Sequence, residues 1–91
     1  MLPKRRSPTR PGEILLEDFL KPLGMTQNEL ASRMGVPIQR VNLLVNGRRA
    51  VTPETAILLS RVFKTTPQFW LNAQMAFDLW SAEQRMNRKA G

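Results

Sequence analysis

The chain has 91 residues, enough for one domain with a modest hydrophobic core. It contains neither cysteine nor histidine, which excludes disulfides, thiol nucleophiles, histidine general bases and the usual zinc ligands. Its net charge of +7 favours a polyanionic partner such as nucleic acid. We therefore expect no enzyme, no metal and no cofactor. Because no apolar run could span a bilayer and the basic N-terminus lacks the apolar part of a signal peptide, we expect a cytoplasmic protein.

The chain begins with a basic segment, residues 1–10, that contains two prolines and few apolar side chains. We expect it to be a flexible arm, which either follows a DNA minor groove or stays disordered. A first helix is predicted over about residues 11–20, before a break at Pro22. Its acidic side chains are interpreted as a solvated first turn facing the helix dipole, rather than as a catalytic carboxylate pair. They are Glu13, Glu17 and Asp18.

Residues 25–49 combine the features of a helix-turn-helix. Thr26 and Glu29 have the spacing of a capping box, which predicts a second helix over residues 26–34. Gly35 tolerates the positive φ that ends such a helix. The segment therefore predicts a capped helix followed by a tight turn.

A third helix is predicted over residues 37–46, with an apolar back and a polar front. We expect it to enter the DNA major groove, because this segment is net positive while the first helix is net negative. Gln39 suits adenine, and Arg40 suits either guanine or a phosphate. The loop after it is expected to contact phosphates, the alternative being a solvated loop. The expected DNA-contacting residues are Gln27, Ile38, Gln39, Arg40, Asn42, Leu43, Asn46, Arg48 and Arg49.

Two Thr-Pro pairs predict a fourth helix from about residue 52 and a fifth over about residues 67–85. Trp70 is expected in the core. The rest of the fifth helix should extend beyond a small globular domain, so we expect its apolar side chains to form a homodimer contact. The alternative is a helix that folds back on its own domain. The expected dimer residues are Phe77, Leu79 and Trp80.

Five segments carry a resemblance to a known family: RPGEIL (10–15), MTQNELA (25–31), NGRRAVTPETA (46–56), PQFWLNAQ (67–74) and DLW (78–80). With them, the chain resembles the HigA/VapI-type antitoxins of bacterial toxin–antitoxin modules. These belong to the lambda-repressor-like (XRE) helix-turn-helix proteins.

The resemblance implies an all-α, five-helix lambda-repressor-like DNA-binding domain with an extended C-terminal helix. The resemblance covers about residues 10–83. From the predicted elements along the chain, we expect one DNA-binding and dimerisation domain at residues 11–85, between the flexible basic arm at 1–10 and a basic tail at 86–91. The resemblance also implies a homodimer that represses its own operon at a palindromic operator. The partner it implies is a HigB/RelE-like mRNA nuclease toxin, which the antitoxin neutralises.

Two positions depart from the family's pattern. Pro37 stands where a serine or threonine cap is common, so the cap hydrogen bond is lost. Leu43 stands where a polar base-reading side chain is common, and it offers apolar contact alone, for example with a thymine methyl group. Two alternatives stay open, and these two residues keep the second of them open. One is a stand-alone XRE-type transcriptional regulator without a toxin partner. The other is a protein-interaction module that has lost DNA binding.

Overall fold

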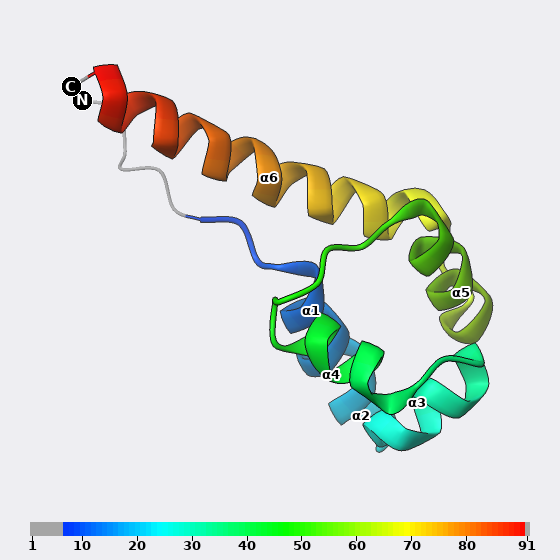
Figure 1. Ribbon diagram of the computed structural model, residues 1–91. Helices are drawn as coiled ribbons and strands as arrows, with labels where there is room; N and C mark the ends of the chain where they lie inside the picture. Colours follow the sequence, from blue (N-terminus) through cyan, green and yellow to red (C-terminus); the bar gives the residue numbers. More distant parts are fainter. Residues whose placement is uncertain (1–6, 91) are drawn as a thin grey trace.

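The computed structural model describes residues 7–90, and all regular structure within that range is helical (Figure 1). The all-α prediction is confirmed. The first three short elements form one continuous rod where the first helix was predicted, and the remaining four elements correspond to the four later predicted helices. The elements are α1 (Pro11–Ile14), η1 (Leu15–Leu20, a π-helix), α2 (Lys21–Leu23), α3 (Gln27–Met34), α4 (Ile38–Val45), α5 (Pro53–Phe63) and α6 (Pro67–Ala90).

The first helical rod is longer than predicted, because it continues past Pro22 to Leu23. Proline lacks an N–H group, and its ring clashes with the carbonyl four residues earlier in an α-helix. The preceding π-helical turns accommodate it, since there the Lys21 N–H bonds to the Leu16 carbonyl, five residues back. Pro22 therefore alters the helix without ending it.

The predicted helix-turn-helix is present, with the expected local chemistry. The Thr26 hydroxyl accepts from the Glu29 N–H at 3.0 Å, and the Thr26 N–H donates to the Glu29 carboxylate at 3.2 Å. Gly35 ends α3 at φ 72°, and the Val36 N–H returns to the Ala31 carbonyl at 3.0 Å. This turn directs the chain from α3 into α4.

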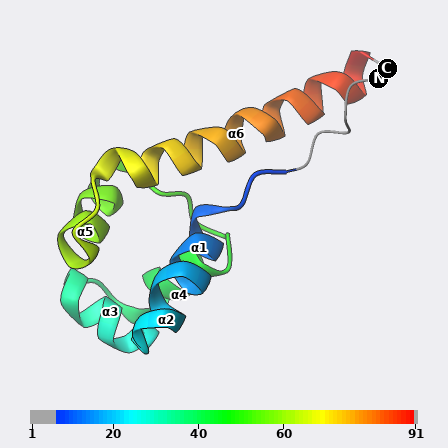
Figure 2. The same cartoon turned by 180° about the vertical axis from the view of Figure 1, so that it is seen from behind.

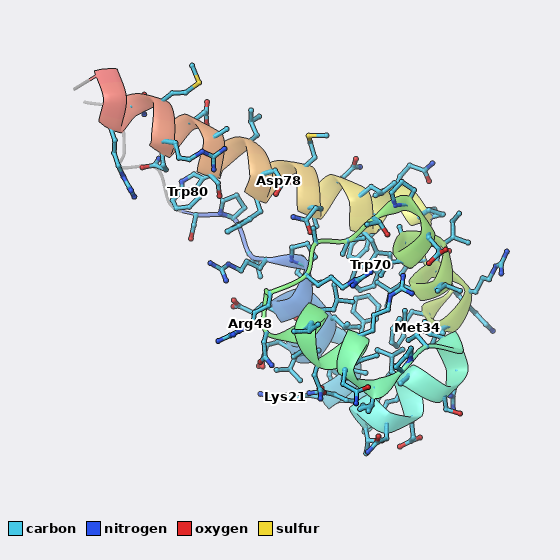
Figure 3. The ribbon with its side chains drawn as sticks, in the orientation of Figure 1. Lys21, Met34, Arg48, Trp70, Asp78 and Trp80 are labelled. Atoms are coloured by element: carbon cyan, nitrogen blue, oxygen red, sulfur yellow. The ribbon has the colours of Figure 1, made fainter. Side chains whose placement is uncertain are left out.

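The core lies where α1 to α5 meet the first part of α6. Trp70 is completely buried, as predicted, and its indole Nε1 donates to the Thr65 hydroxyl at 2.8 Å. Its ring lies 5.1 Å from that of Phe19, centroid to centroid. Figure 3 shows Trp70 pointing inward among the helices. The buried apolar residues are Leu15, Leu20, Leu30, Ala31, Met34, Val41, Leu44, Val51, Ala56, Leu59 and Trp70.

The rod and α4 cross in direct backbone contact at Gly12. A Cβ atom on Gly12 would lie 2.0 Å from the Leu44 carbonyl oxygen, so any larger residue would push the two helices apart. Because Leu44 belongs to α4, this contact sets the position of the proposed recognition helix. The glycine of the RPGEIL segment thus has a packing role.

The last helix, α6, projects beyond the globular part and gives the molecule an elongated shape of 46 × 22 × 21 Å (Figures 1 and 2). It runs to Ala90, so residues 86–90 continue the helix rather than forming a separate tail. Most of the predicted basic arm, residues 1–6, lies outside the described residues. No helix in the described range is long and apolar enough to cross a membrane.

Candidate nucleic-acid interface

The outer face of α4 carries a continuous row of exposed side chains. Val41 and Leu44 are buried against the core on the opposite side of the helix. The exposed positions have the i, i+3, i+4, i+7 spacing of one helical face. They are Gln39, Asn42, Leu43 and Asn46, all four from the predicted set. The row thus presents three side-chain amides and the apolar Leu43 to solvent, and exposed amides are what reading base edges requires.

Two arginines follow this row directly. The Arg48 N–H bonds to the Leu43 carbonyl at 2.8 Å, after a left-handed turn at Gly47 with φ 72°. Arg48 and Arg49 are both exposed, and neither forms an ion pair with another described residue. Figure 3 shows Arg48 projecting away from the helices. Both guanidinium groups are therefore available to an anion.

Two further predicted residues lie at the margin of this face. Gln27 is the first residue of α3, and Ile38 is the first residue of α4. Both side chains are half-buried, and Ile38 packs against the core. The structure thus places them at helix N-termini, where backbone N–H groups also point outward.

Arg40 behaves differently from the other predicted residues. Its Nη2 donates to the Glu54 carboxylate at 2.8 Å and to the Thr55 hydroxyl at 3.1 Å. Both partners lie on α5, so the guanidinium turns towards α5 and away from the row on the outer face of α4. The structure therefore places the Arg40 guanidinium against α5, behind the exposed row.

Known proteins are similar to this chain in sequence and in fold. A helix-turn-helix family model matches residues 16–70. The chain is 48% identical to YbaQ of Escherichia coli, an uncharacterized HTH-type transcriptional regulator, over 89% of this chain and 72% of that protein. It is 42% identical to Antitoxin HigA-1 of Vibrio cholerae, over 94% of this chain and 81% of that protein.

The chain is a helix-turn-helix protein of the HigA antitoxin family. A solved structure of the antitoxin GraA in complex with its operator is similar over 99% of this chain and 91% of that one, with 41% identity and a TM-score of 0.86. Family membership also confirms the expectation that the chain is not an enzyme.

The α6 helix of this HigA-family protein presents two different apolar faces. Phe77 is half-buried, and the Arg10 guanidinium carbon lies 4.8 Å from its ring centroid in a cation–π contact. Trp80 is also half-buried, and its ring lies 6.0 Å from that of Phe77. Figure 3 shows Trp80 on the side of α6 that faces the segment leading into α1. Phe77 and Trp80 are therefore partly covered by their own protomer, although α6 itself projects beyond the globular part.

The other apolar face of α6 is open and includes Leu79, which is 57% exposed. Met75 and Met86 accompany it at 66% and 69% exposure, although they were not among the predicted dimer residues. Their spacing of four and then seven residues was readable in the sequence as one helical stripe. We call Met75, Leu79 and Met86 the α6 stripe.

Proposed function

We propose that this protein is an antitoxin and a sequence-specific autorepressor. As a homodimer, it binds a palindromic operator upstream of its own operon, and it neutralises a HigB/RelE-like mRNA nuclease toxin in the cytoplasm. One observation carries the DNA-binding part: the polar outer face of α4 is exposed and continues into Arg48 and Arg49, which form no ion pair with another described residue. The family membership and the likeness to GraA with its operator support the same conclusion.

In this proposal, the outer face of α4 reads base edges in the major groove. The Gln39 carboxamide pairs with adenine, and such a bidentate contact discriminates by about 1–3 kcal/mol. Asn42 offers the same chemistry one turn later. Leu43 contributes apolar contact with a thymine methyl group, which gives its 41% exposed side chain a partner.

Phosphate contacts hold this face on the duplex. Arg48 and Arg49 supply the positive charge, and the Asn46 side-chain amide donates a hydrogen bond to a phosphate from the end of the row. Gln27 and Ile38 lie at the N-termini of α3 and α4, whose backbone N–H groups favour a phosphate. Arg40 acts indirectly in this proposal, since it ties α4 to α5 and so holds the reading face steady.

The homodimer presents two copies of α4 to one face of DNA. Two reading helices spaced by about one helical turn, ~34 Å, require a two-fold symmetric operator. We propose the α6 stripe as the contact between the copies, because an exposed row of large apolar side chains gains most from a second apolar surface. Leu79 is thus retained from the predicted interface, while Phe77 and Trp80 support the stripe from within the protomer.

A salt titration tests the phosphate contacts. Replacing Arg48 and Arg49 with alanine removes two contacts per protomer, so the slope of log Kd against log salt should fall by about 3–4 for a dimer. Fluorescence anisotropy with the DNA upstream of the protein's own gene gives this slope. A variant with Arg85 and Arg88 replaced by alanine is the control, because it loses the same charge near the far end of α6. An unchanged slope in the first variant would exclude the proposed contacts.

The toxin requires a separate experiment. If an adjacent gene encodes a small basic nuclease, that nuclease should co-purify with this protein. Its mRNA-cleaving activity should disappear when this protein is added. If no such neighbour binds while operator binding persists, the stand-alone regulator is correct. If the protein has no affinity for its own upstream DNA, the interaction module without DNA binding is correct.

A further inference from the structure

The loop that carries Arg48 and Arg49 is attached to α6 by one glutamine side chain. Oε1 of Gln74 accepts from the Val51 N–H at 2.8 Å. Nε2 of the same carboxamide donates to the Asp78 carboxylate at 2.9 Å, one turn further along α6. Both ends of the Gln74 amide are therefore used, and Asp78 fixes which end faces the loop.

This hydrogen bond lies at the far end of the arginine segment. At the near end, the Arg48 N–H is anchored to the Leu43 carbonyl on α4 at 2.8 Å. Val51 follows three residues later and is 5% exposed. The two arginines thus lie between an anchor on the recognition helix and an anchor on α6.

Arg48, Arg49 and Ala50 are all exposed, so little side-chain packing supports the loop between these anchors. A cavity of about 230 Å³ opens between the loop, the start of α1 and α6. Where packed side chains are few, individual hydrogen bonds decide the position of a segment. The residues lining this cavity include Arg10, Arg48, Arg49, Gln74, Phe77 and Asp78.

We propose that Gln74 is a positioning residue for DNA binding. It holds the loop on α6, so that less conformational entropy is lost when Arg48 and Arg49 bind the phosphates. This inference rests on the proposed phosphate role of those arginines. It also connects α6, which bears the α6 stripe, to the DNA-binding loop. This connection lies within one protomer and involves neither the DNA nor a second copy directly.

Two variants separate the hydrogen bond from the shape of the side chain. Gln74→Met keeps the length of the side chain and removes both polar groups. Gln74→Glu combined with Asp78→Asn reverses the second hydrogen bond: the new carboxylate still accepts from the Val51 N–H, and the new amide donates to it. The second variant has the net charge of the natural protein. Gln68→Met is the matched control, because Gln68 is exposed at the start of α6, six residues before Gln74.

The experiment measures anisotropy with a labelled duplex from upstream of the protein's own gene, and with an unrelated duplex of equal length. Gln74→Met should weaken binding to both duplexes about tenfold, since the loop loses its hydrogen bond to α6 in each protomer of a dimer. The charge-matched double variant should return to within about threefold of the natural protein. Amide hydrogen exchange at Val51 should quicken in Gln74→Met and slow again in the double variant.

Three outcomes overturn the inference. The first is that Gln74→Met binds DNA with the affinity of the natural protein, while the variant with Arg48 and Arg49 replaced by alanine binds more weakly. This outcome excludes the role of Gln74 and leaves the proposed function unchanged. The second is weak binding by the double variant despite slow exchange at Val51. The third is natural affinity in the arginine variant itself, which removes the proposed phosphate contacts and this inference together.

Discussion

Arg40 and Glu54 form an ion pair between α4 and α5, with 2.8 Å between Nη2 and Oε1. The Arg40 side chain is 22% exposed, whereas Glu54 is 73% exposed. The same Nη2 also donates to the hydroxyl of buried Thr55 at 3.1 Å. An arginine on α4 therefore holds the back of that helix, although its residue type alone indicates a DNA contact.

Replacing Arg40 with methionine should destabilise the domain. Methionine retains an apolar chain but loses the hydrogen bonds to Glu54 and Thr55, at an expected cost of about 1–3 kcal/mol in the free energy of unfolding. Urea titration measures this cost. Preference among operator sequences should stay the same, whereas Gln39→Ala should alter preference with stability changed by less than about 0.5 kcal/mol. A change of base preference in the Arg40 variant, with natural stability, would contradict this assignment.

Gly12→Ala should be strongly destabilising. The new methyl group would overlap the Leu44 carbonyl oxygen, so α1 and α4 must separate at an expected cost of about 3 kcal/mol. Thermal unfolding followed by circular dichroism measures the effect. Gly24→Ala is the control, because Gly24 has open space around its Cα and should cost only about 1 kcal/mol through its positive φ. Equal losses in the two variants would show that crowding at Gly12 is unimportant.

The two apolar faces of α6 should respond differently to substitution. Leu79→Glu with Met86→Glu introduces charge on the α6 stripe, so the dimer should dissociate while the protomer remains folded. Phe77→Ala should instead lower the free energy of unfolding by about 2 kcal/mol or more, because Phe77 packs within its own chain. Light scattering and urea titration separate the two effects. A dimer that survives both glutamates excludes the α6 stripe as its interface.

Lys64→Gly should stabilise the protein. Lys64 ends α5 in the left-handed region at φ 57°, where a side chain costs about 1–2 kcal/mol relative to glycine. Glycine loses more backbone entropy on folding, so the expected net gain is about 0.5–1 kcal/mol. Lys64→Ala is the control for the lost charge, and it should give no gain. A midpoint of urea unfolding that falls in the glycine variant would show that the left-handed turn is unstrained.

The helices and the reading face of this protein follow from local sequence. Capping at Thr26 and the glycine at position 35 depend on neighbours within five residues, so their chemistry is visible in the sequence. The exposed row on α4 follows from a helical period applied to a segment with one apolar side. This is why three of the expected base-contacting residues, Gln39, Asn42 and Leu43, lie together on that face with Asn46.

Only the tertiary structure decided what Arg40 and α6 do. Glu54 and Thr55 are 14 and 15 residues from Arg40 in sequence, so their contact depends on how α5 packs against α4. The α6 helix has apolar side chains on two faces, and the hydrophobic pattern cannot tell which face turns inward. The burial of Trp70 in the core fixes that rotation, because a helix cannot turn about its axis without withdrawing its largest anchored side chain.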